Sequence, residues 1–177
     1  MSTRPEGRPL TPSDAEAAHA LQAQAFGVRP DPAPDGWPGP GTRAFGAFTG
    51  GALAATAHVH GLASWFGGRP VATAGIANVA VRPEERGTAL LAPLFAAVAA
   101  DARERGEAVS TLFPTAPGIY RRLGYELVGE LVDVEVPVAA LSRVAPAAGV
   151  TLRRAGPGDR EAARAVRAAA TSSTRSP

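Results

Sequence analysis

The chain has 177 residues and no cysteine. Without cysteine there are no disulfides, no thiolate metal ligands and no cysteine nucleophile. Lysine is absent too, and all 18 basic residues are arginines. The absence of lysine excludes a Schiff-base lysine, a kinase lysine and the lysine of a phosphate-binding P-loop.

The chain also has little excess charge and no long apolar run. Its net charge is +2, and its arginines are scattered rather than interleaved with aromatics, which argues against a nucleic-acid partner. No stretch of 18 apolar residues could form a transmembrane helix, and the first twelve residues lack the apolar core of a secretory signal. We therefore expect a cytoplasmic enzyme or binding protein with no membrane partner.

Glycine and proline are what the chain has in plenty, with 20 and 17 residues. Their share fits a loop-rich globular domain and is below the level of low-complexity disorder. Residues 29–41 hold five of the prolines and three of the glycines. This stretch is predicted to be a loop, and its length is typical of a functional one.

The first half predicts a strand, a helix and three more strands. A strand over residues 7–10 precedes a helix over 15–26 that ends at Gly27. Strands are then expected over 43–49, 52–66 and 70–81, because glycine pairs separate them as in hairpin turns.

The second half adds a parallel strand. Apolar residues at helical spacing follow a short loop at 86–89, and Pro93 fits only the first helical turn, so the helix begins near residue 89 or 90. Further elements are predicted over 108–113 (strand), 115–123 (helix) and 125–136 (long strand). The strand–helix–strand order pairs residues 76–81 with 108–113 in parallel.

The predicted fold is therefore α/β (α+β): a mixed, mostly antiparallel sheet with one parallel pair, flanked by helices. Open sheets bind ligands beyond the carboxyl ends of parallel strands. Residues 1–137 would form this domain and 138–149 an Ala/Pro/Gly-rich linker. Residues 150–177 resemble the opening strand and helix, so we expect the start of a truncated second domain with a disordered tail from residue 172.

Two segments could carry chemistry. Free amides at a helix start bind anions, so residues 86–91 could hold a diphosphate with added charge from Arg86; an ordinary strand-to-helix loop is the alternative. Tyr120 lies in the predicted helix after the second parallel strand. It could donate a proton to a leaving group, or it could be a half-buried core aromatic.

Together the two segments resemble the GNAT superfamily of N-acyltransferases. The stretch Arg86-Gly87-Thr88-Ala89-Leu90-Leu91 is similar to the family's pyrophosphate motif. The runs over residues 75–83 and 119–125 resemble more closely the Eis-type acetyltransferases of actinobacteria. The resemblance covers about residues 8–137. The strand and helix predicted after residue 150 would match the opening of a second GNAT domain.

The resemblance implies an acetyl-CoA-dependent N-acetyltransferase. Backbone groups over Val79, Ala80 and Val81 would hold the pantetheine arm and thioester. Residues Arg86, Gly87, Thr88, Ala89, Leu90 and Leu91 would hold the pyrophosphate. Tyr120 would protonate the departing thiolate, and the acceptor would be a primary amine of a small aminoglycoside-like polycation. Direct attack of an amine needs no protein nucleophile, and a distorted strand near Asn78–Val79 could offer an oxyanion N–H.

Departures from the family pattern leave alternatives open. Ala89 puts a methyl where the motif has glycine, and Arg121 and Leu123 replace a glycine and a phenylalanine beside Tyr120. Eis-type enzymes have three domains, which is more than the resemblance covers. A non-catalytic acyl-CoA-binding or structural fragment is therefore the second candidate. A nucleotide-binding βαβ unit is a poorer third, because no G-x-G-x-x-G is present. The oligomeric state stays open; a homo-oligomer would fit a longer form of the chain.

The remaining candidates carry less information. His58 and His60 share a strand face, but without a nearby carboxylate they make a poor metal site, and no metal is expected. Asp31 and Asp35 in the proline-rich loop could attract a cation, or they could be ordinary solvated loop acids. The aromatic residues Trp37, Trp65 and Phe66 could line an acceptor cleft or simply pack.

Overall fold

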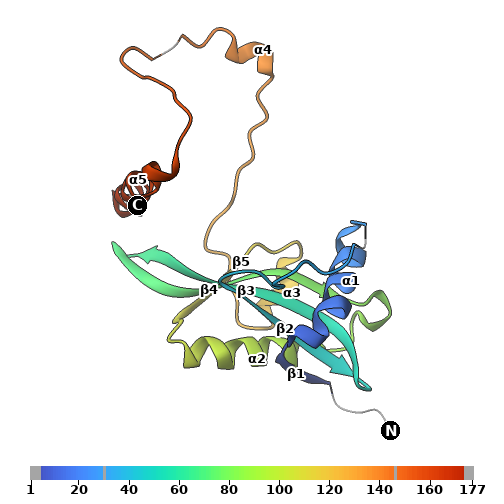
Figure 1. Cartoon of the computed structure of the whole chain (residues 1–177). Helices are drawn as coiled ribbons and strands as arrows, with labels where there is room; N and C mark the ends of the chain where they lie inside the picture. Colours follow the sequence, from blue (N-terminus) through green and yellow to red (C-terminus); the bar gives the residue numbers. More distant parts are fainter. Residues whose placement is uncertain (1–4, 30, 146, 174–177) are drawn as a thin grey trace. The chain divides into compact units, whose positions relative to one another are not determined.

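A computed structural model describes residues 5–29, 31–145 and 147–173 of the chain (Figure 1). The chain divides into two compact units, one ending at Gly124 and one beginning at Tyr125. The first unit carries the sheet and its covering helices, so it is described first. Within the described residues, no helix is long and apolar enough to span a membrane.

One five-stranded sheet organises the first unit. Its strands are β1 (Glu6–Pro9), β2 (Thr42–Thr49), β3 (Ala52–Phe66), β4 (Arg69–Val81) and β5 (Val109–Leu112). They lie in the order β1-β2-β3-β4-β5. All neighbours are antiparallel except β4 and β5, which are parallel. This confirms the predicted fold class.

Glycines end the elements where the sequence predicted. Gly27 takes a left-handed conformation after helix α1 (Ala15–Phe26). Both glycines of each predicted hairpin turn, at 50–51 and 67–68, have positive φ, which glycine adopts without the strain of a Cβ. The β3–β4 hairpin extends past its neighbours, because β2 pairs with β3 only as far as His60.

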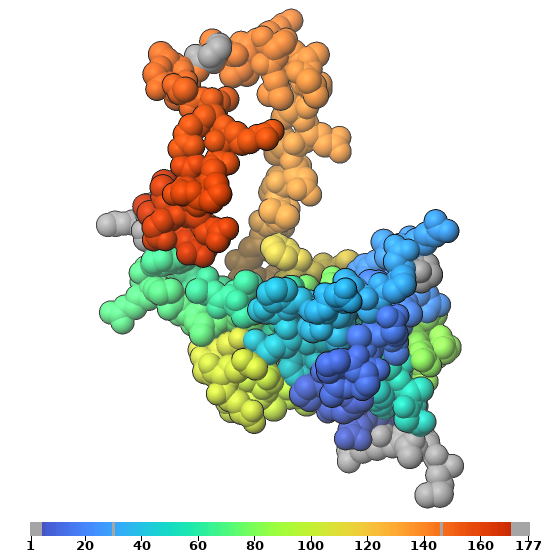
Figure 2. All heavy atoms as spheres, in the orientation of Figure 1, coloured from blue at the N-terminus to red at the C-terminus, as the bar shows by residue number. Residues whose placement is uncertain are grey.

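Helices α1 and α2 (Leu91–Glu104) cover the sheet. Helix α1 packs against β3 and β4, and α2 packs against β1, β2 and β3 (Figure 1). Figure 2 shows α1, in blue, beside the lighter blue segment that follows it, and the Ala33 N–H donates to Glu16 Oε1 at 3.1 Å. The most deeply buried large side chains are Phe45, Leu94 and Val59.

The contact between β1 and α2 depends on a missing side chain. A Cβ placed on Gly7 would lie 2.0 Å from the Pro93 carbonyl oxygen. Only glycine lets β1 approach the first turn of α2 so closely, because that distance is far below van der Waals contact. Gly7 therefore sets how near the start of α2 sits to the sheet.

The predicted strand over residues 125–136 is wrong, and so is the strand that the similarity to the opening of the chain predicts over residues 150–153. Both stretches have no regular secondary structure, and the apolar side chains Val128, Leu131, Val132 and Val134 are exposed. Alternating apolar residues favour a strand, but a strand also needs a neighbour for its backbone hydrogen bonds. No strand of the described chain pairs with these residues.

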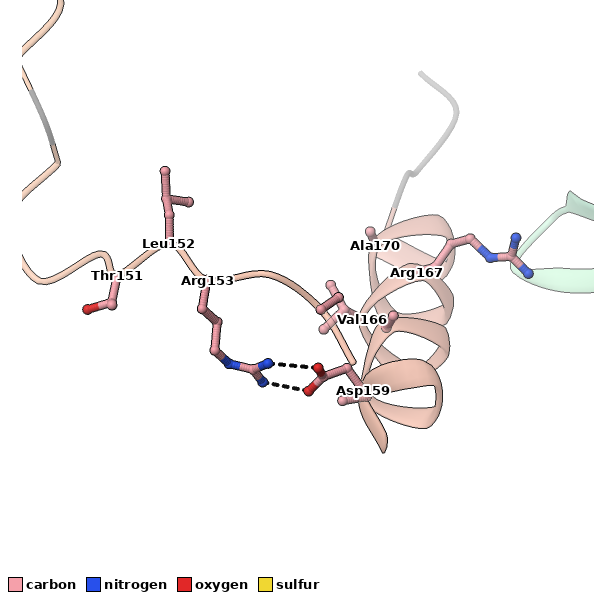
Figure 3. Close-up of a pocket in the computed structure, with 10 residues that line it drawn as sticks. Thr151, Leu152, Arg153, Asp159, Val166, Arg167 and Ala170 are labelled. Atoms are coloured by element: carbon pink, nitrogen blue, oxygen red, sulfur yellow. Dashed lines mark hydrogen bonds and ion pairs between the residues drawn. The ribbon is translucent and has the colours of Figure 1, made fainter. Parts of the chain in front are cut away.

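The second unit repeats the opening of the first. Arg8 makes a two-pronged ion pair with Asp14 at 2.8 and 2.9 Å, just before α1. Arg153 pairs with Asp159 in the same way, just before α5 (Arg160–Ser173) (Figure 3). Each aspartate also accepts the backbone N–H three residues upstream, from Thr11 and Gly156.

Nearly all the described residues in the rest of the second unit are exposed. The predicted linker contains one short helix, α4 (Val138–Leu141). A shallow hollow lies between residues 151–155 and the face of α5 that carries Val166 and Ala170 (Figure 3). The tail predicted to be disordered lies mostly outside the described residues, which reach Ser173.

Candidate functional site

Strand β4 extends beyond the end of its pairing with the parallel strand β5. The β4–β5 pairing runs from Thr73 opposite Val109 to Ile76 opposite Leu112. The parallel pair was predicted, but over residues 76–81, so that register was wrong. Strand β4 continues to Val81, and no strand of the described chain pairs with it beyond Ile76 on the β5 side. A gap in the ladder therefore opens at the carboxyl ends of the parallel strands.

A bulge lies in β4 beside this gap. Thr56 of β3 pairs with Ala80, but His58 pairs with Ala77. Between these two pairs β4 therefore has one residue more than β3. Asn78 has a φ of 52°, which is rare for a residue with a side chain. The distortion predicted near Asn78 and Val79 is confirmed as a β-bulge.

The bulge changes which residues face the gap. Successive residues of a strand turn their backbone groups to opposite sides. The Ala108 N–H donates to the Ala72 carbonyl, so Ala72, and with it Ala74 and Ile76, face β5. Past the bulge the Arg82 N–H donates to the Ala54 carbonyl of β3, so Val79 and Val81 face the gap. The backbone of Ala80 faces β3.

The segment after β4 reaches α2 through a tight loop. A 3-10 helix, η2 (Pro83–Glu85), leads into residues 86–90, where Gly87 and Ala89 have φ values of 83° and 43°. Helix α2 begins at Leu91, with Pro93 in its first turn, close to the predicted start. Residues 86–89 of this loop are exposed, whereas Leu90 is buried.

Several amides of this loop have no acceptor within the protein. In the described chain, no backbone or side-chain acceptor takes the N–H of Gly87, Ala89, Leu90 or Leu91. The Thr88 N–H and hydroxyl both donate to the Glu85 carbonyl, so Thr88 closes the loop. Free amides at a helix start, with the helix dipole behind them, favour an anion.

Tyr120 comes to the same end of the sheet from β5. It lies in α3 (Pro117–Arg121), a short helix that starts at a proline. Its half-buried ring packs against Phe95 of α2, with centroids 5.8 Å apart and planes tilted by 59°. The contact is compatible with both roles considered for this tyrosine. It joins α3 to the helix that begins at the amide loop.

The sequence analysis missed a polar pair beneath the bulge. His58 is 7% exposed, and its Nδ1 lies 3.3 Å from Asn78 Nδ2. Its ring also makes an edge contact with Trp37, with centroids 5.8 Å apart. Burial, with help from His60 and His19, lowers the pKa of His58 to about 4. Among the described residues no three metal-ligating side chains cluster, and His60 pairs instead with Thr42.

The other aromatic and acidic candidates are dispersed. Trp37 is half-buried against α1 and His58. Trp65 and Phe66 are exposed near the tip of the β3–β4 hairpin, opposite Pro70 and Arg69. Asp31 and Asp35 are exposed in the proline-rich loop. Of the three aromatics weighed as cleft residues, only Trp37 reaches the bulge region.

Comparison with known proteins shows the family to which this chain belongs. Residues 6–128 match the family model of the acetyltransferase (GNAT) domain. A search of curated proteins gives no match. A crystal structure of a GCN5-related N-acetyltransferase from Kribbella flavida is 28% identical over 98% of this chain, with a TM-score of 0.78.

Two further structures are similar. Eis1 from Mycobacterium abscessus is 28% identical over 69% of this chain, with a TM-score of 0.59. A predicted acetyltransferase from Clostridium acetobutylicum, solved with acetyl-CoA, is 15% identical over 75% of this chain and matches in fold, with a TM-score of 0.58. The chain spans 45% of the Kribbella protein, 31% of Eis1 and 96% of the clostridial protein.

Proposed function

Because the chain belongs to the GNAT acetyltransferase domain family, we propose that it transfers an acetyl group from acetyl-CoA to an amine. The observation that carries the proposal is the gap beside β4. There a bulge turns the backbone of Val79 and Val81 toward the side on which no described strand pairs with β4, next to a loop with free amides. An extended, hydrogen-bonding arm that ends in a diphosphate fits this pair of features.

The backbone is proposed to hold the donor in two places. Val79 and Val81 would bond the amides of the pantetheine arm, as a neighbouring strand would. The N–H groups of Gly87, Ala89, Leu90 and Leu91 would bind the pyrophosphate, with Arg86 adding positive charge. Thr88 would act indirectly, by fixing the loop through Glu85. Ala80 would contribute only by packing, because its side chain is 3% exposed.

The reaction needs little from side chains. The amine lone pair attacks the thioester carbonyl carbon, and a backbone N–H at the bulge stabilises the oxyanion. The carbon–sulfur bond then breaks and the Tyr120 hydroxyl protonates the departing thiolate; the amine loses its proton to solvent, from which the tyrosinate is reprotonated. The place of Tyr120 after β5, against α2, supports this role.

The acceptor is proposed to be a primary amine of a small polycation, as in aminoglycosides. The support is the motif over residues 119–125 and the similarity to Eis1. We also propose that residues from 150 onward begin a second domain of the same kind, after a domain over 1–137 and a linker over 138–149. The repeated arginine–aspartate pair before α5 supports this part.

A non-catalytic acyl-CoA-binding module is the second candidate, favoured by the alanine at position 89. Titration calorimetry with acetyl-CoA, CoA and ATP tests binding, and thiol release with a panel of amines tests turnover. Binding of acetyl-CoA and CoA, but not ATP, with acceptor-dependent thiol release supports the enzyme. Binding without release on any amine supports the module, and no binding of CoA or acetyl-CoA contradicts both.

A further inference from the structure

The side chain of His58 is polar but occupies a buried position of the kind that apolar residues usually fill. It is 7% exposed, packed beside Trp37 under the bulge of β4. Burying a polar group costs stability unless it is hydrogen-bonded. With its pKa lowered to about 4, the imidazole is neutral at neutral pH, so one ring nitrogen can accept a hydrogen bond.

The one hydrogen bond of this ring goes to the bulge. The Asn78 Nδ2 group donates to His58 Nδ1 at 3.3 Å. In the described chain, His58 Nε2 is buried without a hydrogen-bond partner. The polar function of the buried ring is therefore directed at Asn78, the residue that carries the unusual backbone.

Asn78 needs such an anchor. Its φ of 52° costs free energy for any residue with a side chain, although asparagine tolerates it better than most. A strained conformation persists only where its surroundings fix it. Asn78 is itself exposed, and the bond to the buried His58 ties its side chain to β3.

We propose that His58 is a positioning residue for the acyl donor. By accepting the hydrogen bond from Asn78 it fixes the bulge, and the bulge turns the backbone of Val79 and Val81 toward the gap beside β5. His58 itself does not touch the donor. The inference rests on the proposed function, because the gap matters only if acetyl-CoA occupies it.

A double-mutant cycle tests the proposal, with acetyl-CoA affinity measured by calorimetry on the full chain. His58→Leu removes the acceptor and keeps an apolar side chain of similar size. Asn78→Gly removes the donor and still adopts positive φ, so the fold remains. Each change is expected to weaken binding roughly two- to tenfold, the range of one hydrogen bond. The double mutant should bind no more weakly than the weaker single mutant.

His60→Leu is the matched control. His60 lies two residues along β3 and bonds Thr42 rather than Asn78, so its loss should leave acetyl-CoA affinity unchanged. Coupling between positions 58 and 78 is a readout that general destabilisation would not produce. Circular dichroism melts confirm that each variant is folded, and if His58→Leu is not, Asn78→Gly alone still tests the bond.

Three outcomes overturn the inference. Folded single variants that bind as tightly as wild type, additive losses in the double mutant, or an equal loss in His60→Leu would each do so while leaving the proposed function intact. A wild-type chain that does not bind acetyl-CoA would overturn the inference and the proposed function together.

Discussion

Replacing Ala89 by glycine tests the loop at the start of α2. Ala89 has a φ of 43°, and the left-handed region costs a residue with a Cβ about 1–2 kcal/mol. Glycine avoids that cost, but it also gives the unfolded chain more conformational entropy, which lowers the stability of the folded state by about 0.4–1 kcal/mol. The Ala89 side chain is exposed, so no burial is lost. The midpoints of these two ranges leave a stabilisation of about 0.8 kcal/mol.

Thermal denaturation measures the effect. For a chain of this size, 1 kcal/mol corresponds to a change in Tm of roughly 2–4 °C. Ala89→Gly is therefore expected to raise Tm by about 1–4 °C. Ala96→Gly is the matched control, because Ala96 is also exposed but lies inside α2. It should lower stability by about 1 kcal/mol, with the opposite sign.

Binding gives a second readout of the same change. If the alanine methyl crowds the diphosphate, Ala89→Gly should tighten acetyl-CoA binding by on the order of 1 kcal/mol. If the Tm of Ala89→Gly falls or stays level while the Tm of Ala96→Gly falls, the left-handed conformation at position 89 is refuted. A raised Tm with weaker binding would mean that the methyl packs on the ligand.

Further predictions concern Tyr120, Gly7 and Asp14. Tyr120→Phe should lower kcat roughly 10²-fold or more with little change in acetyl-CoA affinity, and an unchanged kcat would make the hydroxyl structural. In urea denaturation, Gly7→Ala should cost about 1–3 kcal/mol or more, because the new Cβ meets the Pro93 carbonyl; Gly118→Ala, with open space around it, should cost little. The hydrogen bond from Arg8 holds the pKa of Asp14 well below its usual range, so its stabilisation is present above about pH 4 and is lost as the pH falls. Asp14→Asn should remove this loss between pH 5 and pH 2 in urea titrations, and an unchanged acid slope would contradict it.

Elements with local signals were predictable from the sequence. Glycine pairs mark both hairpins, Gly27 marks the end of α1, and Pro93 marks the first turn of α2. The strand–helix–strand order gave the parallel pair, because such crossovers follow a general rule. The motif resemblance pointed to residues 79–81, the amide loop and Tyr120, and the fold brings these to one end of the sheet.

Features set by distant partners were not predictable. The parallel register depends on where β5 stops beside β4, which no local pattern encodes. The strand over residues 125–136 failed because alternation shows only that a face is apolar, and pairing needs a neighbour. The pair of His58 and Asn78 joins residues twenty apart across a bulge, so a histidine on a strand looked like a weak metal candidate.

Backbone strain points to the same site as the family resemblance. In the described chain, Asn78 and Ala89 are the only residues other than glycine with positive φ. Such conformations cost free energy and concentrate at binding and catalytic sites, where the surroundings fix them. Here they bracket the end of β4: one turns the strand backbone toward the gap, and the other shapes the loop with the free amides. Strain that served only the fold would have no reason to gather at these two places. Relieving it at position 89 should therefore raise stability, whereas loosening the anchor of Asn78 should weaken binding of the acyl donor.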